Sequence, residues 1–457
     1  MGYKGHDWKM DREILRLAVP SILANITVPL VGMVDTAVAG HLTVADGFST
    51  AAYIGSISVG AMMLNLIYWM AGFLRTGTGG LTAQAFGRGD MHECGRIFGR
   101  TMGVAGIIAA LILALQLPFC HLTLAMTGAS AQVSELATRY FLIRIWAAPA
   151  TVSLMAFRGW FVGMQDSVSS MCTDLVVNVV NIISSIVLSL GAGPWSGLGF
   201  DGIALGTVVA QYCGMAYAAF VSVHKYGRRT FAGLSLRECF RSGEMRSFMS
   251  MNADLILRSV CFTVIYMGET MIAARFGDIY LACNAILMNL LMIFSYFVDG
   301  FAYAGEALTG RFIGERNRAR LKRSVVYVMV WSMAIGVLFL GIYGVSGMPL
   351  LRIMTSDSAV VAACREFLPW LMLMPPLGCA AFAWDGIYLG ATASRSIRNA
   401  MFAAMVSFLG VWYAGDLLLR PSGAASLHLL MGAYFAHLLA RTVVLSTGWR
   451  SSILDRA

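Results

Sequence analysis

The chain consists of long hydrophobic segments separated by short polar connections, and this pattern predicts its structure. A helix needs about 20 consecutive apolar residues to cross a bilayer, and twelve segments of the 457-residue chain reach that length. We therefore expect an all-α polytopic membrane protein with twelve transmembrane helices. They lie near 14–41, 52–76, 96–117, 134–158, 168–190, 202–223, 248–274, 280–304, 324–345, 361–390, 398–418 and 425–447.

Composition supports this fold class, because 58% of the residues are hydrophobic and only 12% are charged. The net charge of +9 would fit a nucleic-acid partner, but the Lys and Arg residues gather in alternate connections. The connections 42–52, 117–132 and 190–202 contain none, and basic connections mark the cytoplasmic face. We expect no nucleic-acid partner and a cell (inner or plasma) membrane location, with both termini cytoplasmic.

The two halves of the chain repeat each other. The polar connection 225–246 divides the segments six and six, and an offset of 227 residues aligns Gly159 with Gly386 and Gly163 with Gly390. Repeats of six spans share one orientation, so a pseudo-two-fold axis along the membrane normal relates the two bundles. We predict an N-terminal lobe at 1–224, a cytoplasmic linker at 225–246 and a C-terminal lobe at 247–457. A cavity between two such bundles is typical of transporters.

The first segment carries an unusual carboxylate. At about 100° per residue, Asn25, Pro29, Gly32 and Thr36 share one face, and Asp35 flanks it. A carboxylate inside a membrane helix costs roughly 2.5–3.5 kcal/mol on insertion scales, so it normally faces a cavity or a partner. The alternative is an interfacial position near the outer surface. The polar face beside Asp35 favours the interior.

The fifth segment has a polar stripe along an otherwise aliphatic helix. Asp174, Asn178, Asn181 and Ser185 are spaced by four, three and four residues and so share a face. The stripe has two interpretations. Interhelical hydrogen bonds worth about 0.6 kcal/mol each would hold helices together, or the stripe lines a cavity. Four polar positions favour the cavity, since one Asn would suffice to join two helices.

Further candidate residues lie in the second half. Glu269 fits a cavity and the membrane interface equally well. Asp299 is expected to be buried deeply enough to need a partner. Glu306, on the same face as Asp299, is expected to be interfacial. Asp385 and Tyr388 share a face beside the small-residue pair Gly386 and Gly390.

Charged and sulfur-containing side chains complete the candidates. One turn separates Asp254 from Arg258, which predicts a local ion pair. Arg144 is a candidate counter-ion for one of the acids, and the sequence leaves that partner open. The nine cysteines are scattered without a CxxC pair, so neither a disulfide framework nor a zinc site is expected. No phosphate loop, nucleophile elbow or His cluster is present, and we expect neither catalytic residues nor an enzyme.

Five stretches resemble the multidrug and toxic compound extrusion (MATE) family, and its DNA-damage-inducible F-like branch in particular. They are VDTAVAGHL (34–42), RIWAAPATVSLMAFRGWFVGMQDS (144–167), NVVNII (178–183), DGFAYAGEALTGRFIGERN (299–317) and WDGIYLGATASRSIRNAM (384–401). The resemblance implies two six-helix lobes and efflux of organic, often cationic, compounds against inward protons or sodium. It further implies that Asp35 and Asn181 belong to the ion-coupling site, and that Glu269 and Asp385 match acids used in some branches.

The chain departs from this family at one position that matters for coupling. Many relatives carry an aspartate four residues after the asparagine, where this chain has Ser185. A proline often found after the fourth-helix motif is also missing, and Ser169, Ser170 and Met171 stand there. The first departure leaves Asp35 as the main acid of the first lobe.

The sequence therefore predicts a secondary-active multidrug efflux transporter that works by alternating access. Its predicted ion-coupling residues are Asp35, Asn178, Asn181 and Ser185, and its predicted substrate-cavity residues are Asn25, Glu269, Asp299, Asp385 and Tyr388. We favour protons over sodium, because one carboxylate offers little charge to compensate a dehydrated metal ion. An oxygen-ligand sodium site on the same residues is the competing hypothesis.

Two rival functions remain, and the expected partners are few. One rival is flipping of a lipid-linked substrate, with Arg144 holding an anionic headgroup. The other is a membrane-embedded enzyme, for which no convergent catalytic set is found. We expect a small-molecule substrate, membrane lipid, a monomeric state and no cofactor besides the coupling ion.

Overall fold

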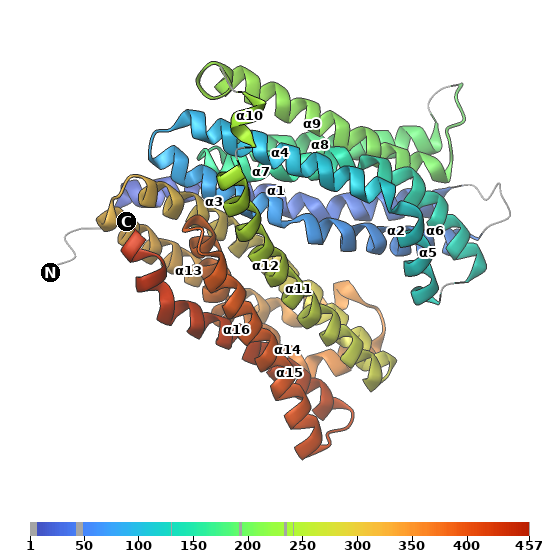
Figure 1. Cartoon of the computed structure of the whole chain (residues 1–457). Helices are drawn as coiled ribbons and strands as arrows, with labels where there is room; N and C mark the ends of the chain where they lie inside the picture. The colour runs from blue at the N-terminus through green and yellow to red at the C-terminus, as the bar shows by residue number, and fades with distance from the viewer. Residues whose placement is uncertain are drawn as a thin grey trace. The chain divides into compact units, whose positions relative to one another are not determined.

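The computed structural model describes residues 7–42, 49–128, 130–191, 194–232, 235–240 and 242–456. Within these ranges, twelve helical spans are long and apolar enough to cross a membrane (Figure 1). The predicted all-α class and the twelve spans are confirmed. Two spans consist of two successive helices each: α2 with α3, and α6 with α7.

In the described part of the first half there are nine α-helices before the connection, and all of them except α5 belong to the first six spans. They are α1 (Trp8–His41), α2 (Thr50–Ala71), α3 (Phe73–Gly87), α4 (Met91–Ala114), α5 (Gln116–Thr127), α6 (Ala131–Arg144), α7 (Ala148–Gly163), α8 (Ser167–Leu190) and α9 (Phe200–Thr230). A short helix, α10 (Leu236–Cys239), lies in the connection. The last six spans are α11 (Ser242–Ala273), α12 (Asp278–Gly314), α13 (Arg318–Met354), α14 (Ser358–Gly390), α15 (Ser394–Leu419) and α16 (Ala424–Ser452).

The short polar connections determine where several of these helices begin. Their side chains accept hydrogen bonds from the first backbone N–H groups, which have no partner within the helix. Asp90 caps α4, Ser130 caps α6 and Asp166 caps α8. In the second half, Asn317 caps α13 and Asp357 caps α14. The connections thus stop one apolar helix and start the next within a few residues.

The chain forms two compact units. The first-half unit comprises Leu23–Thr82 and Asp90–Arg246, and the second-half unit comprises Met1–Ile22, Ala83–Gly89 and Ser247–Ala457. The second-half unit thus begins directly after the predicted linker, and it also includes the start of α1 and the end of α3. The lobe boundaries drawn from the sequence stay a prediction.

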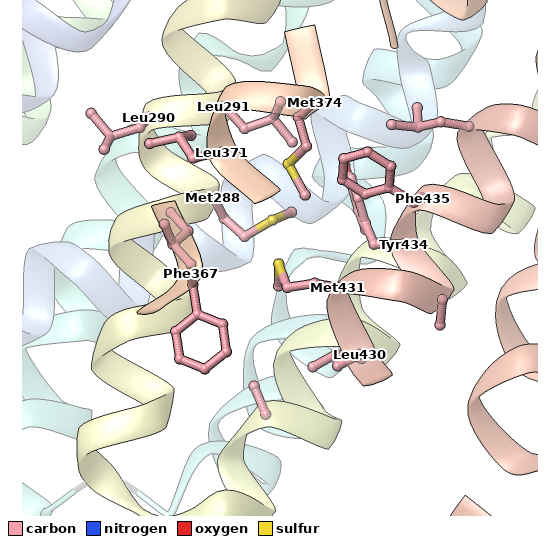
Figure 2. Close-up of a cluster of buried hydrophobic side chains, with 14 of the residues drawn as sticks. Met288, Leu290, Leu291, Phe367, Leu371, Met374, Leu430, Met431, Tyr434 and Phe435 are labelled. Atoms are coloured by element: carbon pink, nitrogen blue, oxygen red, sulfur yellow. The ribbon is translucent and has the colours of Figure 1, made fainter. Parts of the chain in front are cut away.

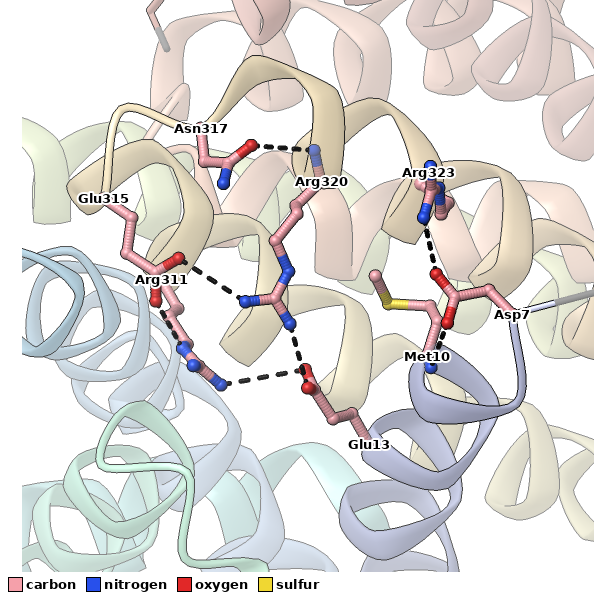
Figure 3. Close-up of polar contacts among 8 residues, drawn as sticks. All are labelled: Asp7, Met10, Glu13, Arg311, Glu315, Asn317, Arg320 and Arg323. Atoms are coloured by element: carbon pink, nitrogen blue, oxygen red, sulfur yellow. Dashed lines mark hydrogen bonds and ion pairs between the residues drawn. The ribbon is translucent and has the colours of Figure 1, made fainter. Parts of the chain in front are cut away.

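Charged side chains hold the start of α1 within the second-half unit (Figure 3). The Glu13 carboxylate lies 2.9 Å from the Arg320 guanidinium and 3.7 Å from that of Arg311. Just before α1 begins, the carboxylate of Asp7 lies 2.6 Å from the guanidinium of Arg323. That hydrogen bond lowers the pKa of Asp7 below its usual value. These contacts join α1 to the α12–α13 turn, which explains why Met1–Ile22 groups with the second half.

Three helices of the second-half unit meet in an apolar core (Figure 2). Met288 of α12, Met374 of α14 and Met431 of α16 extend into the space between their helices and are at most 6% exposed. Flexible thioethers fill irregular gaps of this kind. These methionines therefore serve ordinary packing.

Equivalent glycines bring helices into close contact in both halves. A Cβ atom at Gly159 of α7 would overlap the backbone carbonyl of Arg75, and one at Gly386 of α14 would overlap that of Ala302. The 227-residue repeat is thus visible in the packing inside each half. Small residues at such positions let helix backbones approach within a membrane.

This packing predicts that Gly386→Ala destabilises the protein. The added methyl group has to displace the α12 backbone, and overpacking of this kind typically costs about 1–3 kcal/mol. Gly410→Ala in α15 is the matched control, because no atom lies within 4 Å of its Cβ position. Unfolding of both variants in mixed detergent micelles measures the effect. Equal stability of the two variants would contradict the packing argument.

Candidate functional site

Asp35 lies inside the first-half unit rather than at its surface. Its side chain sits on α1 and the residue is only 3% exposed, while its neighbour Thr36 is exposed. The hydroxyl of Ser185 on α8 donates a hydrogen bond to Asp35 Oδ1 at 3.1 Å. Asp35 is therefore buried where a first- and a fifth-span residue meet, as expected of a carboxylate that needs a partner, and its depth in the membrane stays a prediction.

The two asparagines of the α8 stripe have partners other than Asp35. Asn181 Nδ2 donates to the Thr207 hydroxyl of α9 at 2.9 Å, and Asn178 Nδ2 donates to the Thr27 hydroxyl of α1 at 2.6 Å. Both bonds join neighbouring helices, as the first interpretation of the stripe predicts. The side-chain oxygen Oδ1 of Asn181 is buried and accepts no hydrogen bond. Within the stripe, Asn178 and Asn181 therefore connect α8 to other helices, whereas Ser185 contacts Asp35.

Arg144 supplies the positive charge beside Asp35, which answers the question that the sequence left open. Its Nη1 donates to the Tyr140 hydroxyl at 2.7 Å, and its charge interacts with that of Asp35. A further acid of the stripe, Asp174, has its own counter-ion, since its carboxylate lies 2.6 Å from Arg158 Nε. Asp35 and Asp174 therefore face different guanidinium groups.

In the second-half unit, two guanidinium groups hold Asp385. Arg441 Nε donates to Oδ1 at 3.0 Å and Arg441 Nη2 lies 2.6 Å from Oδ2, while Arg258 contacts Oδ2 as well. The predicted Asp254–Arg258 pair is wrong. Asp254 instead binds Arg398 at 2.6 Å and Ser394 at 2.8 Å. A one-turn spacing places two side chains on one face of a helix. Here, however, residues of the neighbouring helices α14, α15 and α16 form the ion pairs instead.

Arg441 belongs to this group although no motif or spacing in the sequence marks it. A cation in the otherwise apolar span 425–447 was the available signal, because such a charge needs a partner. Arg441 is 3% exposed, and its charge also interacts with that of Asp299. Asp299 itself is half-buried on α12, and its need for a partner stays a prediction.

The two glutamates among the candidates of the second half are both buried. Glu269 is fully buried, with the Thr270 hydroxyl 3.2 Å from Oε2 and the Asn284 side chain beside it. Glu306 is also fully buried, because α12 and α14 pack closely around it. Whether either residue lies at the depth of the membrane interface stays a prediction.

Tyr388 and Asn25 complete the predicted cavity residues. Tyr388 is fully buried, and its hydroxyl donates to the carbonyl of Leu445 at 2.6 Å. Asn25 is half-buried on α1. Among the described residues, no group of three or more His, Cys, Asp or Glu side chains is placed to hold a metal ion. The cavity assignment of these residues stays a prediction.

In the described part of the chain, twelve helical spans long and apolar enough to cross a membrane, with carboxylate–guanidinium pairs between them, fit a multi-pass membrane transporter. The sequence matches the MatE family model over residues 20–187 and 255–413, which covers most of both halves. The chain belongs to this family of multidrug and toxin extrusion transporters. It is therefore a transporter and not an enzyme.

Relatives and solved structures agree with this assignment. The chain is 32% identical to "DNA damage-inducible protein F" of Escherichia coli (strain K12), over 87% of this chain and 84% of that protein. It is 24% identical to "Probable multidrug resistance protein NorM" of Caulobacter vibrioides, over 87% and 81%. The fold matches the Vibrio cholerae MATE transporter VcmN in the bent form with a TM-score of 0.83 at 15% identity, over 98% of each chain.

Proposed function

We propose that this transporter expels organic, often cationic, compounds in exchange for protons, and that Asp35 is its main proton-binding group. The observation that carries the proposal is the buried Asp35 carboxylate with Ser185 and the Arg144 charge beside it. We further propose a monomer in the inner membrane with both termini cytoplasmic, as the distribution of Lys and Arg indicates.

The pair of Asp35 and Arg144 offers a physical basis for exchange. When Asp35 is deprotonated, its charge balances that of Arg144. When Asp35 binds a proton, the guanidinium charge is left uncompensated. Two unit charges about 8 Å apart repel by roughly 2 kcal/mol at an effective dielectric constant of about 20, which is about thirtyfold in affinity. Proton binding would thus weaken binding of a cationic compound near this pair.

The same arrangement favours protons over sodium. A permanent cation beside Asp35 opposes entry of a metal ion, and the amide groups of Asn178 and Asn181 already join other helices. The buried side-chain oxygen Oδ1 of Asn181, which accepts no hydrogen bond, is the observation that favours sodium. We propose the proton because Arg144 leaves no excess negative charge at the site.

Purified protein in lipid vesicles tests the coupling ion directly. We expect a proton gradient alone to drive movement of a fluorescent organic cation. A sodium gradient at equal pH on both sides is expected to give only the leak of protein-free vesicles. Robust sodium-driven movement at equal pH would contradict the proposal.

Flipping of a lipid-linked substrate has less support than efflux. It relied on Arg144 as the holder of an anionic headgroup. The Arg144 guanidinium instead contacts Tyr140 and interacts with Asp35, so a headgroup would have to displace a carboxylate inside the unit.

A further inference from the structure

An apolar cavity of about 310 Å³ opens within the first-half unit, away from Asp35. It lies between α4, α7 and α9, near the polar connection that follows α9. Its lining includes Phe98, Phe157, Ala219, Val223, Phe231 and Cys239. Such a volume is at the lower end of the roughly 300–1,000 Å³ typical of small-molecule sites.

Aromatic rings and a short helix fix the walls of this cavity. The Phe98 ring lies 4.9 Å from that of Phe157 and 5.7 Å from that of Phe231, measured between centroids. On the other side, α10 lies against α4 (Figure 1), and Arg100 Nε donates to the Cys239 carbonyl at 2.9 Å. The walls of the cavity are therefore held by side-chain packing and a hydrogen bond within the first-half unit.

The mouth of the cavity is apolar and accessible. Val223 on α9 is 66% exposed, and its neighbour Phe220 is 65% exposed. Ser222 is the polar side chain in the lining, and its hydroxyl already donates to the Ala218 carbonyl at 2.8 Å. A ligand inside would thus meet hydrocarbon and aromatic surface with no free hydrogen-bonding group.

The connection beside the mouth carries strong positive charge. Residues 225–246 contain six Lys or Arg and two Glu, a net charge of +4. Arg228 and Arg229 are exposed. At 1.5 Å per helical residue, Arg228 lies about 7.5 Å along the axis from Val223. Clusters of four to eight basic residues next to a membrane helix attract anionic lipids.

We propose that this cavity, the acyl-chain site, binds one acyl chain of an anionic membrane phospholipid whose headgroup contacts Arg228 and Arg229. The aromatic walls would also suit an organic cation, but the two exposed guanidinium groups near the mouth repel cations and attract an anionic headgroup. A transported cation is therefore the less favoured occupant. The proposal is independent of the proposed ion coupling.

Native mass spectrometry of the purified, delipidated protein tests the acyl-chain site. Dioleoyl phosphatidylglycerol and dioleoyl phosphatidylcholine are the probes, because they share acyl chains and differ in headgroup charge. We expect phosphatidylglycerol to bind the wild-type protein about tenfold more tightly. Arg228→Gln with Arg229→Gln is expected to remove most of that preference. Equal retention of both lipids, or tighter binding of a fluorescent organic cation, would overturn the proposal.

Two variants locate the lipid in the cavity. Ala219→Leu fills the cavity and Val223→Trp closes its exposed mouth, and each is expected to lower phosphatidylglycerol binding about tenfold. Ala216→Leu is the matched control, since it places the same side chain on an exposed position of the same helix. Val223 is exposed, so Val223→Trp leaves the packing inside the unit intact. This variant therefore tests the lipid site even if Ala219→Leu fails to fold. Undiminished binding in the Val223→Trp variant, or a dimer in place of bound lipid, would overturn the proposal.

Discussion

Asp35→Asn is expected to reduce proton-driven transport to the leak rate of protein-free vesicles while the protein still folds. Asparagine keeps the size of the side chain and can still accept the hydrogen bond from Ser185, but it cannot bind and release a proton. The Arg144 charge then stays uncompensated in every state. The measurement is uptake of a fluorescent organic cation into reconstituted vesicles under an imposed proton gradient.

Ser185→Ala is the matched control for this prediction. It removes the hydrogen bond to Asp35, worth about 0.5–1.5 kcal/mol, but keeps the carboxylate. We expect it to transport at a reduced yet measurable rate. Wild-type transport by Asp35→Asn would show that Asp35 is structural, and loss of transport in Ser185→Ala alone would give the coupling role to the hydroxyl.

Asp385→Ala is expected to lower the free energy of unfolding by about 3–5 kcal/mol, because removing one partner of a buried ion pair leaves the other charge uncompensated. Here two guanidinium groups, those of Arg258 and Arg441, lose the same carboxylate. Arg441 is 3% exposed, so water cannot replace the lost oxygen atoms. Denaturation in mixed detergent micelles measures the change.

An exposed ion pair of the same unit provides the control. Asp455 lies 3.1 Å from Arg318, and both side chains are about 60% exposed, at 59% and 63%. Exposed pairs contribute roughly 0–1 kcal/mol, so Asp455→Ala is expected to change stability little. If Asp385→Ala were no more destabilising than Asp455→Ala, the carboxylate would not compensate the two cations.

Much of this architecture follows from the sequence, because few backbone conformations can cross the hydrocarbon core of a bilayer. Each span must satisfy its backbone hydrogen bonds internally, so the twelve apolar segments could only be helices. The repeat predicted that Gly159 and Gly386 are equivalent, and both lie where a Cβ would overlap a neighbouring backbone. The cost of a carboxylate in hydrocarbon also predicted the buried position of Asp35.

Only the tertiary structure decided which polar groups meet. Long side chains reach in several directions, and helical spacing constrains neighbours on one helix alone. Arg258 therefore pairs with Asp385 instead of Asp254, and Arg144 lies by Asp35. Glu306 is buried because α12 and α14 pack closely there, which no pattern within α12 encodes. The sequence by itself determined the spans and the acids that need partners, whereas packing between helices determined the partners.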